Sequence, residues 1–198
     1  RGKKEATQSP LKETFLTQPI NSYGKSKEKC EKLIIEKSKV YSFKYSILRY
    51  FNVVGNHISP KIKKTKNLNL FEKIKSCIES GKNFEIHGKK SLTYDGTPIR
   101  DFIHIEDVVS AHIEFIKKQD SQFWNQIYNI GYNKGTSVLQ IVNECKKIFK
   151  DKLKYKFIIK KKGIIEKSVA SNHKFMNKSN WVPKYLEIKK IVKSYYLS

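Results

Sequence analysis

Apolar residues recur along this chain at helical and strand spacings, in segments separated by polar, lysine-rich stretches. Spacings of three and four residues predict helices over residues 22–37, 67–80, 106–117, 137–148 and 186–196. Short runs rich in β-branched and aromatic residues predict strands over residues 45–50, 84–86, 102–105, 127–130 and 155–159. Strands that alternate with helices in this way indicate an α/β fold.

Capping residues set the expected ends of these helices. Ser22 is predicted to cap the first helix, and Thr136 or Ser137 the fourth. Gly81 follows the second helix and is predicted to end it. Residues 1–21 are polar and contain two prolines, so we expect a loop there.

The chain is strongly basic, with 41 lysines and arginines against 18 acidic residues and a formal net charge of +23. Such a charge is typical of nucleic-acid binding. Only three of the basic residues are arginines, although arginine is the side chain that binds bases and phosphates with a bidentate fork. The lysines are spread from Lys3 to Lys193. We therefore expect a solvated lysine surface and no specific nucleic-acid partner.

Cysteine and histidine spacing predicts neither a disulfide framework nor a metal site. Cys30, Cys77 and Cys145 lie far apart, and the five histidines lack the spacing of metal ligands. This pattern indicates reduced thiols in a cytoplasmic protein. No apolar run approaches the roughly 18 residues of a membrane span, so no membrane partner is expected.

Two tyrosines are followed four residues later by a lysine: Tyr23 by Lys27, and Tyr185 by Lys189. Residues four apart share one face of a helix. A lysine cation beside a phenol stabilises the phenolate, which is the form that a general base requires. With 11 tyrosines in the chain, chance alone gives about two such pairs. The spacing by itself therefore selects neither pair.

The motifs around the first pair distinguish it from the second. Ser22–Lys27 is followed, in order, by the stretches Ile47–His57, Asp95–His104 and Tyr128–Gly131. Together they resemble the extended short-chain dehydrogenase/reductase family and, within it, the UDP-glucose 4-epimerases. LRYFNVVGNH and DGTPIRDFIHIEDV are the most specific stretches. The resemblance implies an isomerase that uses NAD to interconvert UDP-glucose and UDP-galactose.

The same resemblance implies the C-terminal part of a doubly wound Rossmann-like domain, interleaved with a smaller α/β domain that binds the nucleotide sugar. The first is expected to comprise residues 1–56 and 101–131, and the second residues 57–100 and 132–198. None of the nine glycines forms the G-x-G-x-x-G loop that holds a dinucleotide, and the chain begins with Arg1. We expect the C-terminal part of a homodimeric enzyme that is inactive by itself.

The resemblance assigns roles at the reacting end of the site. It makes Tyr23 the base and acid at the sugar C4 hydroxyl, and Lys27 the residue that tunes Tyr23 and binds the nicotinamide ribose. Phe51 is placed beside NAD, and Asn52 on the UDP-sugar. The structural alternative is that Tyr50 and Phe51 are core aromatic residues.

At the nucleotide end, the resemblance assigns substrate-binding roles to Asn69, Leu70, Glu85, Ile86, His87, Arg100 and Lys161. The first two are expected to touch the nucleotide at a helix start, and the next three to flank the uridine. Arg100 is expected to bind the diphosphate through charge-assisted hydrogen bonds. Lys161 stands where the family has a second diphosphate-binding arginine. The structural alternative for Arg100 is an ion pair with Asp101.

Two other interpretations remain open. One is a related epimerase or dehydratase that acts on another nucleotide sugar. The other is a non-catalytic remnant or basic binding module that has kept the fold. His104 is expected in the core, Asn129 at the end of a strand, and Tyr185 with Lys189 in a surface segment without a functional role.

Overall fold

The computed structural model describes residues 9–19, 21–55, 68–88, 92–117, 121–159 and 165–197. The helices are α1 (Ser22–Tyr41), α2 (Leu70–Ser80), α3 (Ile105–Lys117), α4 (Val138–Phe149), α5 (His173–Met176) and α6 (Ile188–Leu197). Two short 3-10 helices are η2 (Ser121–Phe123) and η3 (Lys150–Lys152). The strands are β1 (Ser46–Tyr50), β2 (Asn52–Val54), β3 (Phe84–His87), β4 (Ile99–Arg100), β5 (Phe102–His104), β6 (Gln126–Ile130), β7 (Thr136–Ser137), β8 (Tyr155–Ile158) and β9 (Lys167–Ser168).

The predicted elements are present, with corrections at their ends. Helix α1 continues to Tyr41, and its cap is Asn21 rather than Ser22, because the Asn21 side chain accepts a hydrogen bond from the Gly24 amide. Ile105, predicted as extended, begins α3, and α6 begins at Ile188 rather than residue 186. The strand predicted over residues 155–159 ends at residue 158.

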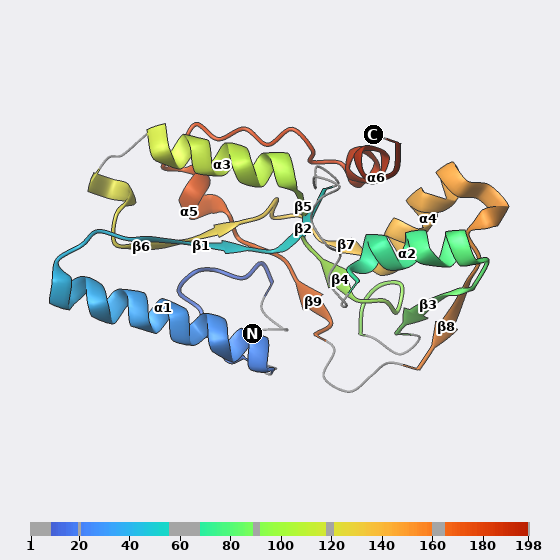
Figure 1. Ribbon diagram of the computed structural model, residues 1–198, viewed down its shortest axis with the longest axis horizontal. Coiled ribbons are helices and arrows are strands. Elements are labelled where there is room, and N and C mark those ends of the chain that lie inside the picture. The colour runs from blue at the N-terminus through green and yellow to red at the C-terminus, as the bar shows by residue number, and fades with distance from the viewer. Residues whose placement is uncertain are drawn as a thin grey trace.

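A parallel sheet with helices on both faces forms one part of the molecule. Strand β1 pairs in parallel with β6, with Ile47 opposite Ile127, and β2 pairs in parallel with β5. Figure 1 shows α1 on one face of the β1–β6 pair and α3 with α5 on the other. Parallel strands are normally covered on both faces, so the expected α/β class is confirmed.

A second group of elements lies beside this sheet, at the right of Figure 1. Strands β3 and β8 pair in parallel, and β7, β4 and β9 form a three-stranded sheet. Helix α2 packs beside β3 and α4 beside β7, and α6 packs against α4 and β5. The predicted boundaries between a Rossmann-like and a substrate domain stay a prediction.

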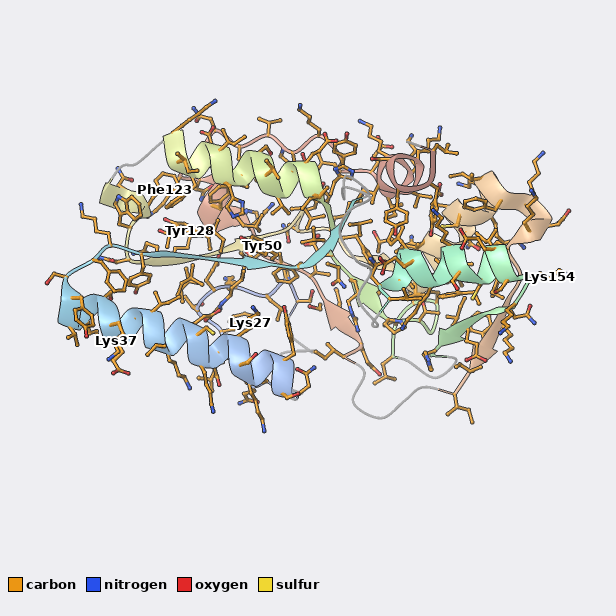
Figure 2. The ribbon with its side chains drawn as sticks, in the orientation of Figure 1. Lys27, Lys37, Tyr50, Phe123, Tyr128 and Lys154 are labelled. Atoms are coloured by element: carbon orange, nitrogen blue, oxygen red, sulfur yellow. The ribbon has the colours of Figure 1, made fainter. Side chains whose placement is uncertain are left out.

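One hydrophobic core joins both groups of elements. Phe71 of α2 lies edge-on to Phe102 of β5, with ring centroids 6.0 Å apart, and 5.1 Å from the ring of Tyr195 on α6. Beneath α3, the ring of Phe123 lies 5.8 Å from that of Tyr128 on β6 (Figure 2). Burying a large apolar side chain stabilises a fold by about 1.5–3 kcal/mol, and the Phe71–Phe102 contact connects the second group of elements to the first.

The helices of the described ranges are each too short or too polar to cross a membrane. Within the same ranges, no group of three or more histidine, cysteine, aspartate or glutamate residues is placed to hold a metal ion. The three cysteines are free thiols, of which Cys30 is exposed and Cys145 buried.

Candidate active site

Tyr23 and Lys27 lie in the first two turns of α1 and share one face. The Lys27 Nζ is 5.5 Å from the centroid of the Tyr23 ring. Both side chains are exposed, Tyr23 to 71%. Gly24 allows this turn to lie close to the preceding loop, since a Cβ there would stand 3.0 Å from the Pro19 Cβ. The helix therefore presents a phenol and an ammonium group together at its N-terminal end.

An ion pair fixes this helix to the neighbouring strand. The Nε and Nη2 atoms of Arg49 on β1 donate to the two carboxylate oxygens of Glu31 on α1, over 2.8 and 2.6 Å. Glu31 lies one turn after Lys27 on the same helix, and Figure 2 shows Lys27 on α1 beneath the strand that carries Tyr50. The bidentate geometry sets the position of the helix along the strand.

Phe51 and Asn52 lie at the carboxyl end of β1, where β2 begins. Their amides donate to main-chain oxygens of Ile130 (3.4 Å) and Asp101 (2.9 Å). The Asn52 side chain is exposed, and Phe51 is half-buried. In open α/β sheets, ligands bind beyond the carboxyl ends of the strands. Figure 1 shows the N-terminal end of α1 and the β1–β2 junction both directed toward the middle of the molecule.

Tyr50 is not the core aromatic residue that the alternative proposed. It is 43% exposed, and its hydroxyl lies 2.8 Å from Nε2 of His112 on α3. Nδ1 of His112 lies 2.8 Å from the Val108 carbonyl oxygen, which assigns the ring proton to Nδ1 and makes Nε2 the acceptor for the Tyr50 hydroxyl. Partial burial raises the Tyr50 pKa. This contact ties the end of β1 to α3.

Asp101, whose main-chain oxygen accepts the Asn52 amide, has a buried carboxylate. Asp101 is fully buried, and its side chain accepts hydrogen bonds from the amides of Tyr132 (2.9 Å), Asn133 (3.0 Å) and Ala170 (3.1 Å). Burial raises its pKa to about 6, against the opposing effect of these hydrogen bonds. Because the Asp101 carbonyl also accepts the Asn52 amide, this residue fixes the site strand to the ends of β6 and β9.

Arg100 binds main-chain oxygens. Its Nη2 donates to Ile165 over 2.6 Å, and its Nη1 to Ile99 over 2.8 Å and to Glu166 over 3.4 Å. Burial lowers the pKa of the half-buried guanidinium. Among the described residues Arg100 makes no ion pair with Asp101, so that alternative is wrong. The physical reason is that main-chain amides already occupy the carboxylate.

Asn69 and Leu70 have defined structural roles. The Asn69 side chain accepts from the Glu72 amide over 3.0 Å, and the Glu72 carboxylate accepts the Asn69 amide over 2.7 Å. This reciprocal pair is a capping box at the start of α2. Leu70 packs against the core. Contact of either residue with a nucleotide stays a prediction.

The residues predicted to flank uridine lie on β3 and differ in exposure. Ile86 is fully buried, so its side chain belongs to the core. Glu85 pairs with Lys156 over 3.1 Å, and His87 Nδ1 lies 3.4 Å from the Ile159 carbonyl oxygen. Lys161 lies outside the described residues. The ligand roles of all four stay predictions.

The second tyrosine–lysine pair does not share a helix face. Tyr185 precedes α6, its hydroxyl donates to Glu106 over 3.0 Å, and its ring stacks on His104 with centroids 3.7 Å apart. Lys189 pairs with Glu187 over 2.7 Å. His104 is fully buried, as expected. These contacts give Tyr185 a packing role.

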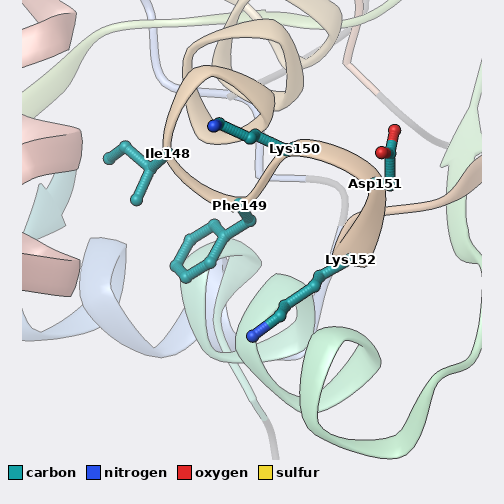
Figure 3. Close-up of a pocket in the computed structure, with 5 residues that line it drawn as sticks. All are labelled: Ile148, Phe149, Lys150, Asp151 and Lys152. Carbon is teal, nitrogen blue, oxygen red and sulfur yellow. The ribbon is translucent and has the colours of Figure 1, made fainter.

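A surface hollow lies at the end of α4 (Figure 3) and contains none of the predicted site residues. It is lined by Ile148, Phe149, Lys150, Asp151 and Lys152. Sequence reasoning missed Glu31, His112 and the buried role of Asp101. Glu31 could have been found, because it continues the four-residue spacing of Tyr23 and Lys27 on one helix face.

Comparisons with known proteins bear on this arrangement. The sequence pattern of the NAD dependent epimerase/dehydratase family matches residues 2–131. The putative UDP-arabinose 4-epimerase 4 of Arabidopsis thaliana is 30% identical over 191 residues, which cover 93% of this chain and 44% of the plant protein. The UDP-glucose 4-epimerase of Lacticaseibacillus casei is 31% identical over 195 residues, which cover 96% of this chain and 58% of the bacterial protein.

The crystal structure of UDP-glucose 4-epimerase from Bifidobacterium longum in complex with NAD+ and UDP has the same fold. It is 28% identical, with a TM-score of 0.81, and the match covers 94% of this chain and 57% of that chain. The chain thus spans about half the length of the relatives it matches. With the tyrosine–lysine helix and the β1–β2 junction in place on a parallel α/β scaffold, the chain belongs to the NAD dependent epimerase/dehydratase family.

Proposed function

We propose that this chain supplies the acid–base and substrate-holding part of an NAD-dependent 4-epimerase that interconverts UDP-glucose and UDP-galactose. The observation that carries the proposal is the exposed Tyr23–Lys27 pair on a helix that Arg49 and Glu31 join to the strand leading to Asn52. The four-residue tyrosine–lysine spacing alone would not support the proposal, because Tyr185 and Lys189 have the same spacing.

Tyr23 takes the proton from the sugar C4 hydroxyl and later returns it. Its hydroxyl is accessible, and the Lys27 ammonium beside the ring stabilises the phenolate that forms. The two exposed polar groups on one helix face fit the ribose of a nicotinamide nucleotide, with Phe51 near its ring. NAD, if bound there, would supply the hydride acceptor and donor for C4.

Asn52 and Arg100 hold the UDP-sugar. The Asn52 side chain is exposed where β1 ends, and its main chain is fixed by Asp101. A guanidinium has five N–H donors, and the contacts of Arg100 with described residues number three. The donors that these described contacts leave would bind the diphosphate through charge-assisted hydrogen bonds. Asn69, Glu85, His87 and Lys161 would complete the nucleotide end.

A second substrate is favoured by a specific observation. The Arabidopsis relative is a putative UDP-arabinose 4-epimerase at nearly the same identity as the Lacticaseibacillus UDP-glucose 4-epimerase. Both sugars carry the same nucleotide, so Tyr23, Lys27 and Asn52 would serve either one. We place the complete enzyme in the cytoplasm as a homodimer.

The test is an enzyme in which residues 1–198 are joined to the part of the Lacticaseibacillus casei protein that this chain does not match. UDP-galactose, UDP-glucose and UDP-arabinose are offered separately with NAD, and the products are separated by chromatography. Interconversion of UDP-galactose and UDP-glucose, faster than turnover of UDP-arabinose, supports the proposal. If UDP-arabinose reacted faster, the enzyme would be assigned UDP-arabinose as its substrate in place of UDP-glucose and UDP-galactose. A folded enzyme that turned over none of the three would overturn the proposed function.

A further inference from the structure

The segment before α1, residues 9–19, is fixed to the strands near its beginning, and we call it the strap. Leu11 forms a parallel bridge with Ala170, just after β9. The Leu11 amide donates to the Val169 carbonyl oxygen over 2.8 Å, and the Leu11 carbonyl oxygen accepts the Ser171 amide over 2.8 Å. Leu11 is buried. Figure 1 shows the strap, in blue, between α1 and the β1–β6 pair.

Glu13 connects the strap to β6 and β1. Its carboxylate accepts the Asn129 amide over 2.9 Å, and the Asn129 side chain donates to the Leu11 carbonyl oxygen over 2.9 Å. The Glu13 carbonyl oxygen accepts from Nη1 of Arg49 over 3.4 Å. The same guanidinium holds Glu31 of α1. The first half of the strap is therefore anchored to β6, to β1 and to the segment after β9.

The second half of the strap contacts the start of α1. The Thr17 hydroxyl donates to the Glu28 carboxylate over 2.6 Å, although the two residues lie 11 positions apart. Above all, this hydrogen bond lowers the pKa of the Glu28 carboxyl. The bond is therefore charge-assisted at neutral pH, and such bonds are among the strong ones. Gly24 lies against Pro19, since a Cβ on Gly24 would stand 3.0 Å from the Pro19 Cβ.

The partly buried side of α1 carries only one aliphatic residue. No residue of this helix is fully buried. Its partly buried residues are Gly24, Glu28, Glu31, Ile35, Lys37 and Ser38. All of them except Lys37 recur at spacings of three or four residues, so they lie on one side of the helix. Apolar packing within this chain therefore holds α1 weakly, and the two carboxylates on that side, each with its own partner, set the position of the helix.

We propose that Thr17 is a positioning residue for Tyr23, which acts by holding Glu28, and with it the first turns of α1, on the strap. The inference rests on the proposed function, in which the Tyr23 hydroxyl must meet the sugar C4 hydroxyl. The Arg49–Glu31 pair lies about two turns beyond Tyr23 on the helix. Glu28 lies closer to Tyr23 and directly follows Lys27. The Thr17 hydrogen bond therefore controls the end of the helix that carries the reacting group.

Two substitutions of Thr17 separate its hydroxyl from its shape. Thr17→Val has nearly the shape of threonine and lacks the hydroxyl, whereas Thr17→Ser keeps the hydroxyl. Misplacing a reacting group by about 1 Å can cost about 10²-fold in rate, while Asn52 and Arg100 hold the UDP-sugar from other elements. In the enzyme that joins residues 1–198 to the remaining part of the Lacticaseibacillus casei protein, Thr17→Val should lower kcat for UDP-galactose about tenfold with KM unchanged. Thr17→Ser should retain most of kcat.

Glu28 tests the same contact from the other side. Glu28→Met removes the acceptor of the Thr17 hydroxyl and should repeat the loss of kcat seen in Thr17→Val. The double variant should lose no more than either single variant, because each substitution removes the same interaction. Lys32→Met is the matched control. It removes the 3.6 Å contact of Glu28 with Lys32, which is 73% exposed, and should leave kcat unchanged.

Amide hydrogen exchange of the joined enzyme measures the hold on α1 without turnover. The amides of Gly24 and Lys25 donate to the side chain and the main chain of Asn21. Their exchange should be about tenfold faster in Thr17→Val than in Thr17→Ser. If the joined enzyme turns over no substrate, the proposed function fails, and this measurement alone decides whether Thr17 holds the start of α1.

The inference is overturned if the exchange of these amides is equal in the two Thr17 variants. It is also overturned if Thr17→Ser loses as much kcat as Thr17→Val, if Thr17→Val changes KM and not kcat, or if the losses of Thr17→Val and Glu28→Met add in the double variant. Circular dichroism shows whether each variant is folded. Where Thr17→Val is not folded, Glu28→Met decides by the same two measurements.

Discussion

Arg49 of β1 and Glu31 of α1 form a two-point ion pair, with Nε–Oε1 and Nη2–Oε2 distances of 2.8 and 2.6 Å. The two side chains are only 16% and 19% exposed. The pair connects the helix that carries Tyr23 and Lys27 to the strand that leads to Asn52. It links these two segments of the candidate site directly.

Glu31→Gln should lower the free energy of unfolding by about 2 kcal/mol, because hydrogen bonds between charged groups contribute about 1.5–3 kcal/mol each. The matched control is Lys32→Met. It breaks the Lys32–Glu28 pair on the same helix, where Lys32 is 73% exposed, and should cost less than about 0.5 kcal/mol. Urea unfolding measures both, and equal effects of the two substitutions would contradict the positioning role of Arg49.

The buried carboxylate of Asp101 should make stability depend on pH. Its pKa is raised from 3.8 to about 6 in the folded chain. A raised pKa means that the stabilising contribution of the protonated form is complete below pH 4 and is lost as the pH rises through 6. The loss amounts to about 3 kcal/mol.

Asp101→Asn removes this titration. Between pH 4 and pH 7, the free energy of unfolding of the native chain should therefore fall by up to about 3 kcal/mol relative to that of the variant. Urea unfolding at four pH values in this window measures it. A difference that stays constant, or one that moves in favour of the native chain, would show that the Asp101 pKa is not raised.

Asn69 offers a test of its capping role at α2. Asn69→Ala should lower the free energy of unfolding by about 1 kcal/mol, since it removes the acceptor for the Glu72 amide. Asn69→Asp keeps an acceptor at the same place and should retain most of the stability. Thermal and urea unfolding compare the two. If both variants lost the same stability, the capping box would not explain the contribution of Asn69 to the free energy of unfolding.

Helices α2, α3, α4 and α6 could be predicted because their apolar residues recur at helical spacing. Helix α4 buries Ile141, Val142 and Cys145 at helical spacing, and Ser137 caps it as one of the two residues proposed. Strands β2, β4, β7 and β9 are two or three residues long, which is too short for an alternating apolar pattern to be recognised in the sequence. They form because distant segments lie beside them, as the Val53–Ile103 pairing shows.

The candidate site could be predicted only in part for the same reason. The spacing of Tyr23 and Lys27 is local and is realised on α1. The partner of Glu31 lies 18 residues away on another element, and the Asp101 hydrogen bonds reach residues 31 to 69 positions distant. Such contacts depend on the assembled fold. The choice of Asn21 over Ser22 as cap likewise follows from the extended backbone of Asn21.

The isolated 198-residue chain should not bind NAD at micromolar concentrations. A dinucleotide pyrophosphate normally rests on a glycine-rich turn at a helix N-terminus, and none of the nine glycines of this chain forms that motif. Calorimetric titration with NAD should give no saturable heat, with the joined enzyme described above as the positive control. Micromolar binding together with epimerase turnover by the chain alone would contradict this expectation.

The central claim is that Tyr23 carries the acid–base chemistry, and a matched pair of substitutions in the joined enzyme tests it most directly. Tyr23→Phe removes the hydroxyl beside Lys27, whereas Tyr185→Phe makes the same change at the tyrosine stacked on His104. General acid–base catalysis contributes about 10²- to 10⁴-fold. We therefore predict that Tyr23→Phe lowers kcat for UDP-galactose by that factor, and that Tyr185→Phe lowers it less than about tenfold. Equal losses, or a fully active Tyr23→Phe enzyme, would contradict the assignment.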